Sequence, residues 1–207
     1  MAVLDALDDI AVNTYIESVA TQAGTVDIAF SAVGPSPRDY GNAKPATELT
    51  IQEFITALAT VVKSQFVAAR AAARHMVTQG SGVIILLTGS PARGHVQGAT
   101  AIGTAFGAIE SLTENLAIEV GPAGVRVVCL RTTANIDSRT IQQTMDSVAA
   151  AMHITKEQAL ASVANLNFLK VPATVTDTAK AAVLLASDNA RMLTGTVVNA
   201  TAGAALD

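Results

Sequence analysis

The sequence predicts an α/β domain in which a parallel sheet lies between layers of helices. Two observations lead to this fold class. Short, continuous apolar runs are typical of strands covered on both faces, and they alternate along the chain with longer segments of helical hydrophobic period. This alternation gives a three-layer arrangement. With 207 residues, the chain is expected to form one domain, 1–207, with one sizeable core.

Four apolar segments are the expected strands. VDIAFS at 26–31 and GVIILLT at 82–88 are rich in aliphatic side chains, and VRVVCL at 125–130 and GTVVNA at 195–200 have a similar composition. Long helical segments separate them in the sequence. We therefore expect these strands to be parallel and buried on both faces.

Helices are expected between these strands. Thr50 and Glu53 have the spacing of a capping box, which predicts a helix that extends to about Gln79 and ends at Gly80. A second long helix is expected over 101–120. Two shorter helical patterns follow within 135–170, and a last helix is expected over 177–187; in the second short pattern, the cap is formed by Thr155 and Gln158.

Composition excludes several classes of function. The formal net charge is -4, so no basic surface is expected for a nucleic-acid backbone. The segment MAVLDALDDIAV does not resemble a signal peptide, and no apolar run approaches the ~20 residues of a membrane-spanning helix. We therefore expect a cytoplasmic protein with neither a nucleic-acid nor a membrane partner. Cys129, the single cysteine, is expected to be a packed core thiol.

No spacing of cysteine and histidine predicts a metal site. The three histidines are scattered, and His75 and His153 are interpreted as solvated helix residues. A group of aspartates near the start could be a carboxylate cluster, but a solvated helix start is the preferred interpretation. These residues are Asp5, Asp8 and Asp9.

Four segments, in order and at matching spacing, resemble the short-chain dehydrogenase/reductase family. VDIAFSAVG resembles the strand that ends in the family's Asn-Asn-Ala-Gly, and GVIILLTGS resembles the next strand, which ends in serine. AIGTAFGAIESLTENLAIEV resembles the helix that follows, and LLASDNARMLTGTVVNATAG resembles the closing segment. The resemblance implies a Rossmann-like sheet, NAD(P)-dependent oxidoreductase activity and association through the two long helices.

The resemblance places hydrocarbon where the family has its proton-transferring pair. In the family, a Tyr-x-x-x-Lys helix supplies a phenol, and the lysine ammonium lowers its pKa. These two positions align with Ile102 and Phe106, and an asparagine of the preceding helix aligns with Val61. Ser90 is the one catalytic position that survives. General acid–base catalysis typically contributes ~10²- to 10⁴-fold, so we expect hydride transfer to be lost.

Other departures from the family pattern also fall on functional segments. The Asn-Asn-Ala-Gly segment is Ser31-Ala32-Val33-Gly34, the Pro-Gly beside the nicotinamide aligns with Thr132-Thr133, and the terminal Gly-Gly is Ala202-Gly203. The strands and helices between these segments keep their apolar patterns. This distribution is expected if the packing of the core is retained while the geometry of the cofactor site is not.

The chain is also predicted to lack the family's first β-α-β-α portion. Its start resembles the family's third strand, with Asp5 at the position that usually faces adenine. The glycine-rich turn that holds a pyrophosphate would precede it. The later glycines do not replace that turn, because they lack its spacing; they are Gly98, Gly103 and Gly107.

This shortened sheet would leave 26–31 with an open edge, which invites pairing with another chain. We expect residues 1–8 to pair beside that strand or to leave the sheet. We also expect another subunit to cover the exposed flank.

Two groups of residues offer alternative catalytic interpretations. Ser90 with His95 could form a nucleophile and base, but a turn-capping hydroxyl is preferred, because no acid is placed to orient the histidine. Tyr40, near Lys44, could be an acid, but a surface tyrosine in a Pro- and Gly-rich loop is preferred. The Gly103-x-x-x-Gly107 spacing indicates close packing of helices instead of chemistry.

Two functional hypotheses remain open. The first is a short-chain dehydrogenase/reductase homologue that has lost hydride transfer and acts as a non-catalytic, homo-oligomeric interaction protein, with no cofactor expected. The second is an NAD(P)-dependent oxidoreductase that acts on a carbonyl or alcohol substrate and has an unusual site or a segment supplied from elsewhere.

Overall fold

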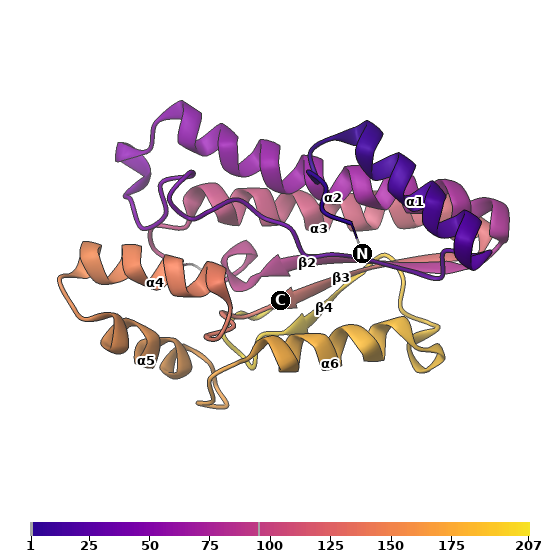
Figure 1. Ribbon diagram of the computed structural model, residues 1–207. Helices are drawn as coiled ribbons and strands as arrows, with labels where there is room; N and C mark the ends of the chain where they lie inside the picture. Colours follow the sequence, from indigo (N-terminus) through magenta and orange to yellow (C-terminus); the bar gives the residue numbers. More distant parts are fainter. Residues whose placement is uncertain (1, 95) are drawn as a thin grey trace.

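The computed structural model describes residues 2–94 and 96–207, and its sheet has four parallel strands in the order β1-β2-β3-β4. Each strand pairs with the next strand along the chain (Figure 1). The predicted α/β class and the parallel sheet are therefore confirmed. The strands are β1 (Ile28–Ser31), β2 (Gly82–Gly89), β3 (Val125–Thr132) and β4 (Thr196–Ala200).

Helices cover both faces of this sheet. Figure 1 shows α1, α2 and α3 on one side and α6 on the other, with α4 and α5 beyond the ends of β3 and β4. The six α-helices of the described residues are α1 (Asp9–Ala23), α2 (Ile51–Gln79), α3 (Thr100–Val120), α4 (Arg139–Met152), α5 (Lys156–Leu166) and α6 (Val175–Ala186).

The predicted helix ends are largely confirmed, because local capping decides them. Thr50 and Glu53 form the expected capping box, and Gly80 ends α2 with a φ of 80°. Thr155 caps α5 as predicted. The last helix begins at Val175 instead of 177, because Thr174 forms a capping box with the Asp177 carboxylate.

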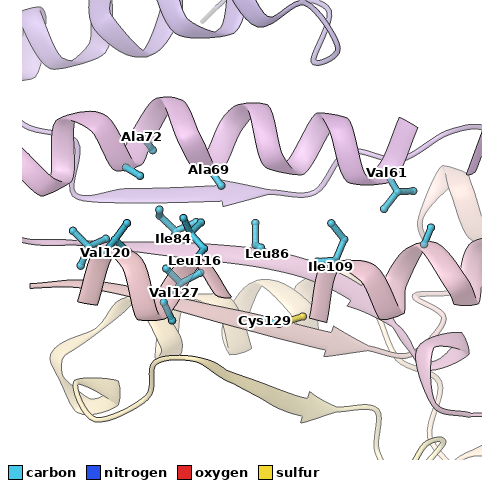
Figure 2. Packing of buried hydrophobic residues seen from close by; sticks show 14 of the residues in the cluster. Val61, Ala69, Ala72, Ile84, Leu86, Ile109, Leu116, Val120, Val127 and Cys129 are labelled. Carbon is cyan, nitrogen blue, oxygen red and sulfur yellow. The ribbon is translucent and has the colours of Figure 1, made fainter. Parts of the chain in front are cut away.

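The side chains of β2 point alternately to the two faces of the sheet, and the core therefore has two layers. Ile84 and Leu86 pack under α2 and α3, whereas Val83 and Ile85 pack against α6. Figure 2 shows the first layer, where small side chains of α2 let that helix approach the strand closely. Val61, Ala69, Ala72, Ile109, Leu116, Val127 and Cys129 line this layer.

The N-terminal segment lies outside the sheet, which is one of the two predicted arrangements. Residues 2–8 form no strand; the Asp8 carboxylate caps α1 by accepting from the backbone N–H groups of Ile10 and Ala11. Leu4 packs in a small cluster against α1 and α2. The aspartates therefore mark a helix start, and the covering of the exposed flank by another subunit stays a prediction.

Two features are absent from the residues that the structure describes. Within 2–94 and 96–207, no helix is both long and apolar enough to span a bilayer. In the same two ranges, no three histidine, cysteine, aspartate or glutamate side chains gather as metal ligands would.

Candidate functional site

The carboxyl ends of β2 and β3 carry small polar residues side by side. Ser90 begins a short 3-10 turn, and its carbonyl oxygen accepts from the backbone N–H groups of Arg93 and Gly94 at 3.1 and 2.6 Å. On β3, the Thr132 hydroxyl donates to the Thr88 carbonyl at 3.2 Å. This edge is where ligands bind in open α/β sheets, so it is the candidate site.

The two positions of the proton-transferring pair lie on α3 and pack as core residues. Ile102 is 8% exposed and belongs to the main hydrophobic cluster. Phe106 is partly buried, and its ring lies against Gly89, where an added Cβ would be 3.0 Å from the ring. Val61, on α2, is 1% exposed. The two positions that align with the family's tyrosine and lysine, and the position that aligns with its asparagine, are thus part of the apolar packing.

A glutamine on α2 holds the end of β2 and was missed in the sequence. The Gln65 side chain is buried, donates to the Leu87 carbonyl at 2.8 Å and accepts from the Leu87 N–H at 2.9 Å. Leu87 lies one residue beyond the paired part of β1, which ends at Ser31 opposite Leu86. The amide therefore satisfies backbone groups that no strand satisfies on that side.

A buried ionic cluster lies behind the site. The Glu110 carboxylate, 2% exposed, accepts from Arg131 Nε at 2.7 Å and from Arg93 Nε at 3.2 Å. Arg131 is 1% exposed and also pairs with the Asp207 carboxylate, which accepts a further hydrogen bond from Asn199. The hydrogen bond from Arg131 lowers the pKa of Asp207. The cluster joins α3, the loop after Ser90 and the ends of β3 and β4.

Tyr40 is buried, so the prediction of a surface tyrosine is wrong. It is 5% exposed, and burial raises its pKa to about 12 although Thr144 provides a hydrogen bond. Lys44 does not accompany it, because its ammonium pairs with the Glu53 carboxylate at 2.5 Å. The loop is folded back onto the core, where a phenol of this pKa is a poor proton donor near neutral pH.

Cys129 is a packed core thiol, as predicted. It is fully buried on β3, and its sulfur lies 3.3 Å from the Thr88 hydroxyl. Burial raises the pKa of the thiol to about 11. A thiolate is therefore scarce at neutral pH, which excludes Cys129 as a nucleophile.

The raised pKa values predict a loss of stability at alkaline pH. The Cys129 and Tyr40 pKa values are about 11 and 12 in the folded chain, against ordinary values of 9.0 and 10.0. Both neutral forms are favoured by folding, so their contribution is fully present below pH 9.0 and is lost as pH rises towards 12. Urea unfolding at stepwise pH should show this decrease. Cys129→Ala should make the decrease in the free energy of unfolding with pH shallower. An unchanged dependence on pH would contradict the contribution assigned to the buried thiol.

The remaining candidate residues do not converge on the site. His75 is partly buried on α2, and His153 is exposed at the C-cap of α4 with a φ of 55°, so it follows the helix instead of lying within it. His95 lies outside the described residues. Gly103 approaches the Pro91 carbonyl of its own chain, while Gly107 faces open space.

Comparison with known proteins decides the family. A family model described as enoyl-(acyl carrier protein) reductase matches residues 1–205. The chain belongs to the short-chain dehydrogenase/reductase family. Short chain aldehyde dehydrogenase 1 of Euphorbia lathyris is 30% identical over 194 residues, which are 92% of this chain and 65% of that protein. This oxidoreductase family membership agrees with the resemblance seen in the sequence.

Solved structures agree with the fold. Sorbitol-6-phosphate 2-dehydrogenase from Erwinia amylovora has a TM-score of 0.88 at 22% identity, over 99% of this chain and 78% of its own. NAD+-bound xylitol dehydrogenase has a TM-score of 0.88 at 20% identity, over 98% of this chain and 78% of its own. The chain spans 65% of the Euphorbia relative and 48% and 44% of the next two curated relatives.

The expectation that no cofactor is associated with the chain is wrong. Structures with this fold contain NAD+ in the xylitol dehydrogenase, NADP in another neighbour and NADH in a third. The expected loss rested on the glycine-rich turn, which would precede this chain, and on departures from the family pattern at 31–34 and 132–133. These departures are local, whereas the fold of the three cofactor-bound neighbours matches 98%, 97% and 98% of this chain.

Proposed function

We propose that this short-chain dehydrogenase/reductase has lost the family's hydride transfer and acts as a non-catalytic subunit of a homo-oligomer. The observation that carries the proposal is that Ile102, which is buried, and Phe106, which is partly buried, pack as hydrocarbon against the core on α3. Neither side chain can ionise or donate a hydrogen bond. Without such groups, the ~10²- to 10⁴-fold contribution of general acid–base catalysis is lost.

The donor set at this edge does not fit proton transfer to a substrate beside a nicotinamide. Among the described residues considered above, Tyr40 has a pKa of about 12 and Cys129 of about 11. The Glu110 carboxylate is held between two arginines. A bound nicotinamide would supply hydride chemistry, but neither the Tyr40 phenol nor the Cys129 thiol supplies a matching proton near neutral pH.

A second candidate function is NAD(P)-dependent reduction of a carbonyl or oxidation of an alcohol. Ser90 favours it, because this serine stands at the family's position and lies at the end of β2 beside a turn. The names of the curated relatives, which include dehydrogenases and a reductase, also support it. Turnover of carbonyl substrates with NADH or NADPH distinguishes the two proposed functions. The second function requires such turnover, whereas the first excludes it.

An apolar groove on the two long helices supports the homo-oligomer. Leu58, Val62 and Phe66 of α2 meet Ala108 of α3 there, and Phe66 is 39% exposed beneath the guanidinium of Arg70. A second copy of the chain would present the same apolar surface to it. Such isologous packing of helices around a two-fold axis is the usual way for identical subunits to cover this kind of surface.

Phe66→Glu is expected to dissociate the oligomer. The substitution places a carboxylate in the apolar groove, where association would have to remove the charge from water. Light scattering after size-exclusion chromatography should show a lower mass at micromolar concentration. Leu169→Glu, at an exposed site in the α5–α6 loop, is the matched control and should keep the mass of the unsubstituted chain. A Phe66→Glu variant of unchanged mass would exclude this interface.

A further inference from the structure

Polar side chains from three segments surround the carboxylate of Asp207, at the carboxyl end of β3 (Figure 1). The buried Arg131 guanidinium of β3 pairs with one of its oxygens, and the Asn199 amide of β4 donates to the other at 3.4 Å. The positive charge of Arg93, in the turn that begins at Ser90, also lowers the pKa of Asp207. These groups together form a receptor for one carboxylate.

The two carboxylates of the cluster are held in different ways. Glu110 belongs to α3 and is 2% exposed, so the helix fixes its position. The Asp207 side chain is 61% exposed. Within the part of the chain that the structure describes, the backbone of Leu206 and Asp207 forms no hydrogen bond, and the Leu206 side chain is exposed. Asp207 is therefore held at the cluster by its side chain and is the carboxylate that can exchange.

The charge of the cluster requires a replacement when Asp207 leaves. Two guanidinium groups and the Glu110 carboxylate would remain, with a net charge of +1. A buried guanidinium that loses its partner is costly. A carboxylate from solution would restore the same pairing, because arginine binds this group through charge-assisted and often bidentate hydrogen bonds. The cluster without Asp207 thus matches a single carboxylate in charge and in shape.

The receptor is continuous with the candidate site. The N–H groups of Arg93 and Gly94 both donate to the Ser90 carbonyl, so the arginine belongs to the same turn as the serine. The turn at 201–205 lies against it, since a Cβ added at Gly94 would be 3.3 Å from the Ala204 carbonyl oxygen. A molecule whose carboxylate binds to the arginines would therefore lie beside the Ser90 turn.

We propose that the two arginines form, with Asn199, a binding site for the carboxylate group of a small molecule, and that Asp207 occupies this site in the absence of that molecule. The site does not depend on whether the chain transfers hydride. A tethered group competes at an effective concentration in roughly the millimolar range, so Asp207 weakens the binding of an external carboxylate. If Asp207 occupies the site about 90% of the time, its removal should strengthen that binding about tenfold.

An NMR titration with sodium acetate tests the proposal, with sodium chloride at equal ionic strength as the reference. In Asp207→Ala, acetate should shift the Nε–H resonances of Arg131 and Arg93. Half-saturation should occur at about a tenfold lower acetate concentration than in the unsubstituted chain. In the unsubstituted chain, acetate should also shift the amide resonance of Asp207, because its side chain is released.

Two further variants show whether acetate binds at the cluster. Glu17→Ala is the matched control, because it removes an exposed carboxylate on α1, outside the cluster, and should leave half-saturation unchanged. Adding Arg93→Ala to Asp207→Ala should weaken acetate binding, because one of the two positive charges is lost. Equal effects of acetate and chloride on Asp207→Ala would overturn the site. Acetate binding to that variant without any change at Asp207 in the unsubstituted chain would overturn the exchange.

Discussion

Replacing Glu110 with alanine should lower the free energy of unfolding by about 3–5 kcal/mol, as is typical when one partner of a buried ion pair is removed. Arg131 is 1% exposed, and its Nε donates to this carboxylate at 2.7 Å. Without Glu110, a guanidinium remains in the core with Asp207 as its described carboxylate partner. Urea denaturation at neutral pH, with the slope of the transition compared between variants, measures the change.

Arg93→Ala is the matched control for this prediction. The Arg93 side chain is 60% exposed and contacts the same carboxylate at 3.2 Å. Because solvent screens such an ion pair, its removal should lower the free energy of unfolding by less than about 1 kcal/mol. Equal losses for the two variants would contradict the conclusion that the buried Arg131–Glu110 pair dominates the cluster.

Restoring the family's side chains, Ile102→Tyr with Phe106→Lys, should lower the free energy of unfolding by about 2–4 kcal/mol. Ile102 is 8% exposed within the main core cluster, so a larger phenol overpacks it. Phe106 packs against Gly89, and a lysine there would lose this contact and place an ammonium close to apolar side chains. Thermal and urea unfolding of the double variant both measure the effect.

Ile102→Val is the control that distinguishes overpacking at this position from a general sensitivity of α3 to substitution. Removing one methylene should cost only about 0.5–1.5 kcal/mol. If the Tyr and Lys substitutions proved neutral or stabilising, the site would still be shaped for the catalytic pair. That result would count against the proposed loss of hydride transfer.

Most of the fold could be predicted from the sequence because its signals are local. The helix over 51–79 follows from a capping box at one end and Gly80 at the other, and both are present. Buried parallel strands give continuous apolar runs, so β2 and β3 were found within two residues of their ends. The start of α6 was missed by two residues, because Thr174 was not recognised as its cap.

The site was harder to predict, because its polar groups pair across long separations in the sequence. Glu110 lies 21 residues from Arg131, and Gln65 lies 22 residues from Leu87. The available signal was a polar residue on the buried stripe of a long helix, at 65 and at 110. Tyr40 was misjudged because proline and glycine in its loop favour exposure, whereas the loop folds onto the core.

A single-turnover assay measures directly whether the chain has lost hydride transfer. The full chain, saturated with NADPH and separately with NADH, is mixed with a panel of aldehydes and ketones, and oxidation of the reduced nicotinamide is followed by its absorbance. The xylitol dehydrogenase whose structure contains NAD+ serves, with its own substrate, as the positive control for the assay. We expect no oxidation above the rate without protein. Oxidation that depends on both protein and carbonyl, and that is abolished by Ser90→Ala, would exclude the proposed loss of hydride transfer.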